Sequence, residues 1–102
     1  MQPWFLYLLR NERGALYTGI TTDLSRRIGE HRSRSGLGGK FTRGCKSLEL
    51  VYDCEVGNRS LASRAELRVK RLSKNRKEAL VNGRPDRRAL LEMLDLPVAV
   101  VD

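Results

Sequence analysis

The sequence predicts an α+β fold, in which a small three-stranded antiparallel β-sheet is flanked by helices in the order β-β-α-β-α-(α). Three observations lead to it. Short segments with the apolar pattern of strands alternate with segments of helical spacing, turn residues separate them, and the length of 102 residues suits one ordinary domain. We expect residues 1–82 to form the main domain, and residues 83–102 to add a C-terminal helix and tail that pack on it or extend it.

The first three elements after the N-terminus read as two strands and a helix. Residues 4–9 are apolar at every position, which is typical of a central strand covered on both faces. Residues 11–14 supply turn types and residues 15–18 resume an extended pattern, so a β-hairpin is expected. Good N-cap residues at 21–23 then lead into a short amphipathic helix over 24–32, with Leu24 and Ile28 on one face.

The second half predicts one more strand and at least two helices. Residues 48–56 alternate apolar and polar side chains, which is the period of a strand. Apolar residues at 61, 65, 69 and 72 recur at helical spacing and predict a helix over about 60–72, with a basic continuation that ends at the Asn82–Gly83 pair. Pro85 and Asp86 begin a last helix, which carries Leu90, Leu91 and Leu94.

The charge balance points to a polyanionic partner. Formal net charge is +8 with a sequence pI near 10.2, which favours nucleic acid, although a merely solvated basic surface remains the alternative. The segment 33–47 contains four glycines and no acidic residue, so we expect a flexible cationic loop. The candidate contacts to nucleic acid fall in two stretches: Arg32, Arg34, Lys40, Arg43 and Lys46 in the first, and Arg68, Lys70, Arg71 and Lys74 in the second.

Two further classes of protein are disfavoured by the sequence. The longest apolar run at the N-terminus covers only residues 4–9, which neither spans a bilayer nor matches a signal peptide, so a cytoplasmic protein without a membrane partner is expected. Cys45 and Cys54 accompany a single histidine, which suits neither a zinc site nor a disulfide framework. Both cysteines are therefore interpreted as free thiols.

Four polar side chains are expected to meet near the first helix. Arg27 and His31 are four residues apart and share a helix face, while Tyr17 lies near the end of the second strand and Tyr7 on the strand paired with it. Phosphodiester cleavage needs an activated water, positive charge on the phosphate and usually a metal ion. Structural interpretations remain open for each residue: the tyrosines as packing residues, Arg27 and His31 as surface groups, and Glu66 as an ion-pair partner of Lys70.

The combined pattern resembles the GIY-YIG nuclease family. It consists of Tyr7, then Tyr17 and Gly19 in a second motif, Arg27 and His31 on the following helix, and Glu66 on a later helix. The resemblance covers about residues 2–80 and is greatest to small stand-alone bacterial members. The family name has glycine and isoleucine where this chain has Phe5 and Thr18, and the family's later asparagine is not assigned here, since Asn75 lies only nine residues after Glu66.

The resemblance implies a role for each matching residue. Tyr7 would act as general base or orient the attacking water with help from His31, and Tyr17 would position water or phosphate. Gly19 would let the backbone turn tightly from strand to helix. Arg27 would steady the scissile phosphate, and Glu66 would bind one divalent cation, Mg²⁺ or Mn²⁺.

The resulting expectation is a metal-dependent endonuclease that hydrolyses duplex or branched DNA with low sequence specificity, and that selects DNA structures of repair or recombination. Two alternatives stay open. One is a non-catalytic nucleic-acid-binding module that retains the fold. The other is an adaptor whose last helix binds a partner protein through Leu90, Leu91 and Leu94.

Overall fold

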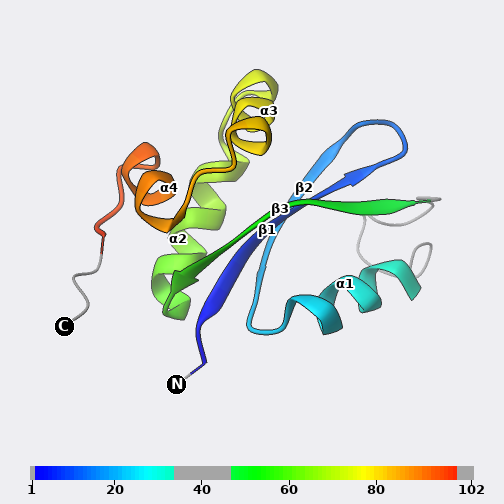
Figure 1. Cartoon of the computed structure of the whole chain (residues 1–102), viewed down its shortest axis with the longest axis horizontal. Coiled ribbons are helices and arrows are strands. Elements are labelled where there is room, and N and C mark those ends of the chain that lie inside the picture. The colour runs from blue at the N-terminus through cyan, green and yellow to red at the C-terminus, as the bar shows by residue number, and fades with distance from the viewer. Residues whose placement is uncertain (1, 34–46, 99–102) are drawn as a thin grey trace.

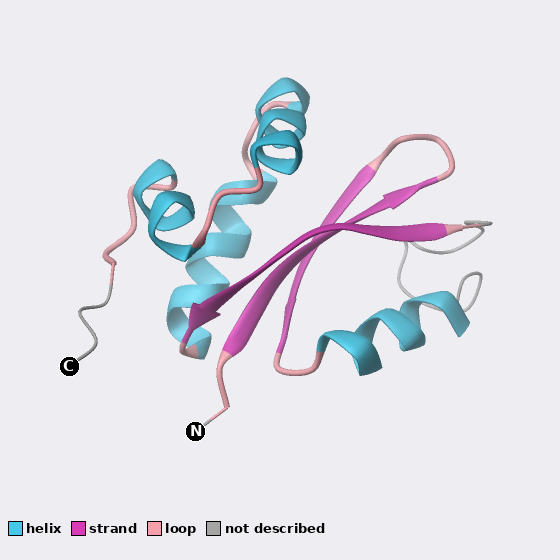
Figure 2. Ribbon diagram, viewed as in Figure 1, coloured by secondary structure: helices cyan, strands magenta, loops and turns pink. Residues whose placement is uncertain are grey.

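The sheet has three antiparallel strands, as the sequence predicts. The computed structural model describes residues 2–33 and 47–98. Strands β1 (Trp4–Asn11), β2 (Leu16–Thr21) and β3 (Leu48–Gly57) pair in the order β2-β1-β3, so the all-apolar segment is indeed the central strand (Figure 2). The Asn11 side-chain oxygen accepts hydrogen bonds from the backbone N–H groups of Arg13 and Ala15 and thereby fixes the hairpin turn.

Helices cover both faces of this sheet. Helix α1 (Leu24–Ser33) lies on one side, and α2 (Arg59–Lys70), α3 (Lys74–Gly83) and α4 (Arg87–Met93) lie on the other (Figure 1). Within the described residues, no helix has the length and apolar character needed to cross a bilayer. The fold is therefore a three-layer α+β arrangement with a single helix over one face.

The alternation of β1 divides the buried side chains between these two faces. Leu6 and Leu8 pack with residues of α2, α3 and α4 in the larger core cluster. Tyr7 and Leu9 point the other way and pack with Ile28 of α1 and Leu48 of β3 in a smaller cluster. Tyr7 is consequently directed toward the helix that carries Arg27 and His31.

Two element boundaries differ from the prediction. Strand β2 continues to Thr21 rather than ending at Thr18. The basic continuation of α2 is a separate helix, because the chain leaves α2 after Lys70 and Ser73 caps α3 by accepting a hydrogen bond from the N–H of Arg76. The order of elements is β-β-α-β-α-α-α.

The C-terminal helix belongs to the larger core, which corrects one expectation. Leu90 and Leu91 are fully buried and Leu94 nearly so, so these leucines hold α4 against the sheet and are not available to a partner protein. Cys54 is a buried free thiol, as predicted. The predicted loop at 33–47 and Cys45 lie almost entirely outside the described residues, which resume at Ser47.

Candidate active site

Tyr7 occupies the centre of the site because its strand neighbour is a glycine. Tyr7 and Gly19 are directly paired across β1 and β2. A Cβ atom at position 19 would overlap the Tyr7 hydroxyl oxygen and Cζ, so the aromatic ring lies across the bare Gly19 backbone. This corrects the expected role of Gly19. It lies within strand β2 and does not have a positive φ, and its missing side chain makes room for Tyr7 instead of allowing a turn.

Helix α1 brings His31 to the tyrosine hydroxyl. The Tyr7 Oη and His31 Nε2 atoms are 3.1 Å apart, and the side chains are 1 % and 6 % exposed respectively. The tautomer of His31 decides which of the two groups donates the proton. The ring of Tyr17 lies against that of His31 in an edge-on arrangement, with 5.1 Å between the ring centroids. The two tyrosines and the histidine therefore form one contiguous cluster, as the spacing on strand and helix predicts.

Arg27 lies between this cluster and solvent. Its guanidinium lies beside the Tyr7 hydroxyl, and that contact raises the pKa of Arg27. Its Nη1 atom also donates to Glu30 Oε1 at 3.1 Å. The predicted convergence of Tyr7, Tyr17, Arg27 and His31 is thus present in the structure. Tyr7 and His31 are buried, whereas Tyr17 is partly exposed and the Arg27 side chain reaches the surface with 39 % exposure.

The electrostatic environment sets the proton states of the buried pair. Burial raises the pKa of Tyr7, and the neighbouring Arg27 guanidinium acts in the opposite direction. Burial and the positive charge of Arg27 both lower the pKa of His31 below 6.5. His31 is consequently neutral at pH 7, with a ring nitrogen able to accept a proton, while Tyr7 carries its proton in the resting state.

Glu66 approaches the cluster from the other layer of the molecule. It lies on α2, which packs on β2 and β1, and its side chain is 25 % exposed. Its charge contributes to the raised pKa of Tyr7, which places the carboxylate within electrostatic range of the phenol. Glu66 also pairs with Lys70 at 3.4 Å, so the ion pair of the structural interpretation is present in the structure.

The donor set suits a divalent cation held by one carboxylate. Residues 2–33 and 47–98 contain no group of three or more His, Cys, Asp or Glu side chains that could hold a metal ion. Mg²⁺ commonly binds through one or two carboxylates, keeps several waters and takes phosphate oxygens of the substrate. The partly exposed Glu66, within electrostatic range of Tyr7, has the chemistry for that type of site, with the remaining positions left to water and substrate.

The predicted nucleic-acid contacts have different structural situations. Arg34, Lys40, Arg43 and Lys46 lie outside the described residues, and Arg32 donates from Nε to the Leu48 carbonyl at 3.3 Å. Arg68 donates to the carbonyls of Leu94 and Asp95 after α4. Lys74 binds Glu78 and the Gly14 carbonyl. The Arg68 and Lys74 side chains thus hold elements of the fold together, whereas Arg71 is exposed at the end of α2.

Neither asparagine of α3 is placed with the cluster. Asn75 and Asn82, which follow Glu66 by nine and sixteen residues, are both exposed. Helix α3 begins near the hairpin turn, where Lys74 contacts Gly14, and ends near Pro85, whose carbonyl accepts from the Tyr52 hydroxyl. Both asparagine side chains are exposed to solvent, and no side chain of α3 is assigned to the site.

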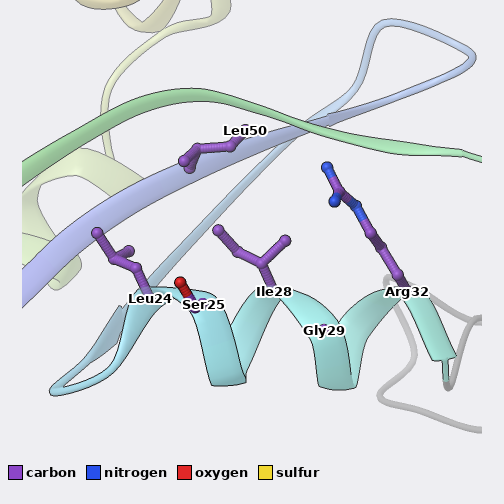
Figure 3. A pocket seen from close by; sticks show the side chains of 6 residues that line it. All are labelled: Leu24, Ser25, Ile28, Gly29, Arg32 and Leu50. Atoms are coloured by element: carbon purple, nitrogen blue, oxygen red, sulfur yellow. The ribbon is translucent and has the colours of Figure 1, made fainter.

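The other side of α1 anchors the helix on strand β3. A groove of about 490 Å³ is lined there by Leu24, Ile28 and Leu50, with Arg32 at one end (Figure 3). Leu24 and Ile28 pack toward Leu50, which fixes the helix with Arg27 and His31 on the side of Tyr7. The apolar face predicted for α1 therefore orients its polar residues.

Comparison with known proteins identifies the family. The family model described as the GIY-YIG catalytic domain matches residues 3–79. This chain belongs to the GIY-YIG family. It is 50 % identical over 98 residues to the UPF0213 protein YhbQ of Salmonella typhimurium, with 96 % of each chain covered, and 49 % identical over 102 residues to a UPF0213 protein of Citrobacter koseri, with both covered completely.

A solved relative has the same fold. The solution NMR structure of a UPF0213 protein from Bacillus halodurans is similar with a TM-score of 0.53 and 36 % sequence identity, over 92 % of this chain and 98 % of that one. The relatives match nearly the whole chain, so this GIY-YIG protein is similar to small proteins that consist of little besides the domain. GIY-YIG membership points to nuclease chemistry, and Tyr7, Tyr17, Arg27, His31 and Glu66 all lie within the matched residues.

Proposed function

We propose that this GIY-YIG protein is a metal-dependent endonuclease that hydrolyses DNA phosphodiester bonds with low sequence specificity. The observation that supports this most directly is the 3.1 Å contact between the Tyr7 hydroxyl and His31 Nε2, with Arg27 beside it. We further propose that the protein acts in the cytoplasm on duplex or branched DNA of repair or recombination. Its net charge of +8 favours a polyanionic substrate, and contacts of basic side chains to phosphates carry no sequence information directly.

The proton states of the cluster support a mechanism for the proposed activity. A phenol of pKa near 10 is about three units, or roughly 4 kcal/mol, from ionisation at pH 7, and burial of Tyr7 raises that pKa further. Neutral His31 is in hydrogen-bond distance to receive the phenolic proton while Tyr7 Oη takes one from the attacking water. Arg27, at the mouth of the site, neutralises charge on the scissile phosphate and favours the phenolate.

Glu66 supplies the remaining part of the proposed chemistry. Its carboxylate would hold one Mg²⁺ or Mn²⁺, which stabilises the charge that develops on the phosphate oxygens. Tyr17 packs edge-on against His31 and thereby restricts the orientation of the imidazole, and its hydroxyl is assigned to positioning water or phosphate. Each of the five residues thus has a distinct task.

Cleavage of plasmid and labelled branched DNA with Mg²⁺, Mn²⁺ or EDTA tests the proposal. Glu66→Ala is expected to abolish the metal-dependent cleavage while DNA binding in EDTA remains. Glu92→Ala is the matched control, because Glu92 also pairs with a basic residue four positions away on a helix, Arg88 on α4. Binding without cleavage by the unchanged protein would instead support a non-catalytic nucleic-acid-binding module.

The same assay tests the role of Tyr7. Tyr7→Phe keeps the buried ring and removes only the hydroxyl, so cleavage should fall by at least the 10²- to 10⁴-fold typical of a lost acid–base group. DNA binding and the thermal midpoint of unfolding should change little. Full activity of the phenylalanine variant would remove Tyr7 from the mechanism.

A further inference from the structure

A carboxylate of α1 is paired with the arginine assigned to the phosphate. Glu30 Oε1 accepts from Arg27 Nη1 at 3.1 Å, and Glu30 Oε2 accepts from Arg26 Nη1, also at 3.1 Å. The two contacts use different oxygens, so Glu30 bridges two guanidinium groups. Arg27 in turn connects this surface carboxylate to the buried Tyr7 hydroxyl.

The pair lies on the solvent side of the buried Tyr7 and His31. The side chains of Arg27 and Glu30 are 39 % and 34 % exposed, in contrast to the buried Tyr7 and His31 behind them. The neighbouring arginines hold the pKa of Glu30 below its ordinary value, so this group stays ionised at neutral pH. A carboxylate and a phosphate are equivalent partners for the guanidinium donors, and both direct their oxygens at the same N–H groups.

We propose, resting on the function proposed above, that Glu30 is an intramolecular competitor of the DNA phosphate for Arg27. In the free protein Glu30 holds the Arg27 Nη1 donor, and the arriving phosphate takes that donor over. Glu30 is not left without a partner, because Arg26 retains its second oxygen. A phosphate can therefore bind Arg27 only if it displaces the Glu30 carboxylate. Anions that do not reach the Arg27 donor in the right orientation bind more weakly as a result.

The expected size of the effect follows from the nature of the pair. Exposed ion pairs such as Arg27–Glu30 are weak. Removing the Glu30 carboxylate, which competes with the DNA phosphate, therefore corresponds to about a two- to five-fold change in DNA affinity. Each phosphate that a basic side chain neutralises adds about 0.9 to the slope of log affinity against log salt concentration. In the proposed exchange the carboxylate next to Arg27 offsets part of this contribution, so removing its charge steepens the slope by up to about 0.9.

The test compares Glu30→Gln with a variant of equal charge. DNA binding is measured in EDTA over a range of salt concentrations, for the whole protein and both variants. Glu30→Gln is expected to bind about two- to five-fold more tightly at low salt and to show the steeper slope. Glu92→Gln raises the net charge by the same amount, because it neutralises the carboxylate that pairs with Arg88 on α4. This variant is expected to keep the salt dependence of the unchanged protein. Glu30→Ala serves as a second variant that also favours the helix, and should shift binding in the same direction.

The outcomes separate this inference from the proposed nuclease activity. Equal behaviour of the Glu30 and Glu92 variants would overturn the competition, as would weaker binding by Glu30→Gln, which would make Glu30 a positioning residue for Arg27. A steeper slope in a protein that cleaves no DNA with Mg²⁺ would retain the competition and reject the nuclease. Absence of DNA binding in all variants would overturn both.

Discussion

At the scale of single residues, the site depends on the absence of a Cβ atom at Gly19. The Tyr7 ring occupies the space in which a Gly19 side chain would lie, and the same ring position places its hydroxyl 3.1 Å from His31. Packing and the proposed catalysis are therefore coupled at this pair. Gly19 is required because of a neighbour on another strand, and neither its own backbone conformation nor its local sequence demands a glycine.

Gly19→Ala is expected to harm stability and cleavage together. The new methyl group overlaps a ring that is 1 % exposed, and overpacking of this kind costs typically about 1–3 kcal/mol. The displaced hydroxyl also loses its contact with His31, so cleavage should fall as far as in Tyr7→Phe. Urea unfolding and the DNA cleavage assay measure the two effects.

Gly29→Ala provides the control with the opposite sign. A Cβ atom at position 29 meets nothing within 4 Å, and glycine within a helix is roughly 0.5–1 kcal/mol less stable than alanine. The same substitution on α1 should therefore raise the free energy of unfolding and leave the cluster intact. If both variants unfolded like the unchanged protein, the proposed contact between position 19 and Tyr7 would be wrong.

At the scale of elements, one carboxylate fastens α3 to the hairpin. Glu78 accepts from both terminal nitrogens of Arg10 on β1 at 2.7 Å, and Lys74 pairs with it at 3.0 Å. Lys74 also donates to the Gly14 carbonyl in the turn between β1 and β2. This network joins residues that are far apart in the sequence and holds α3 against the sheet face that lies opposite Tyr7.

The network predicts a specific loss of stability in acid. Arg10 and Lys74 lower the pKa of Glu78 from 4.5 to about 2. Because the folded-state pKa lies below the ordinary value, the stabilisation is complete above pH 4.5 and is lost as the pH falls toward 2. Thermal midpoints between pH 7 and 2 should therefore fall less steeply for Glu78→Gln than for the unchanged protein.

The matched control for this pH dependence is Glu92→Gln. Glu92 contacts Arg88 at the longer distance of 3.7 Å, and both side chains are largely exposed. Its replacement should leave the pH profile of the thermal midpoint as it is in the unchanged protein. Parallel profiles for Glu78→Gln and the unchanged protein would show that the network does not stabilise the fold.

At the scale of the whole molecule, local patterns predicted the sheet and the convergence of four of the five candidate site residues. The unbroken apolar run of β1 indicates cover on both faces, and the four-residue spacing of Arg27 and His31 places them together because both lie on one helix. Glu66 could not be placed in this way, since its distance from Tyr7 depends on how α2 packs on β1 and β2. Only the family pattern connected Glu66 with the other four residues.

The remaining differences between the sequence-based prediction and the structure come from single capping residues or from contacts between residues distant in the sequence. The break between α2 and α3 is set by Ser73, a single capping residue within a continuous basic stretch. The roles of Arg68 and Lys74 in the fold depend on carbonyls at the end of α4 and in the hairpin turn. A pattern of charges identifies these residues as basic without showing which acceptors they meet.

The last prediction concerns the C-terminal segment and whether it belongs to the folding unit of the domain. Leu90, Leu91, Leu94 and Leu96 are buried in the core that also contains Leu6 and Leu8 of β1. Full burial stabilises by about 1.5–3 kcal/mol for each such side chain, so the four together contribute roughly 6–12 kcal/mol. That approaches the whole stability of about 5–15 kcal/mol of an ordinary domain.

Deletion of residues 84–102 should therefore unfold the protein rather than release an appendage. The deletion also removes the Pro85 carbonyl that accepts from Tyr52, at 2.6 Å. Circular dichroism and urea unfolding should show loss of the cooperative transition, whereas Leu91→Ala, which retains the helix, should cost about 2–5 kcal/mol. A truncated chain with the stability of the whole protein would instead show that α4 lies outside the folding unit, and would return its leucines to the candidates for binding a partner protein. We expect the opposite, because the leucine face of α4 that such a partner would need is already buried in the core, where α4 packs on β3.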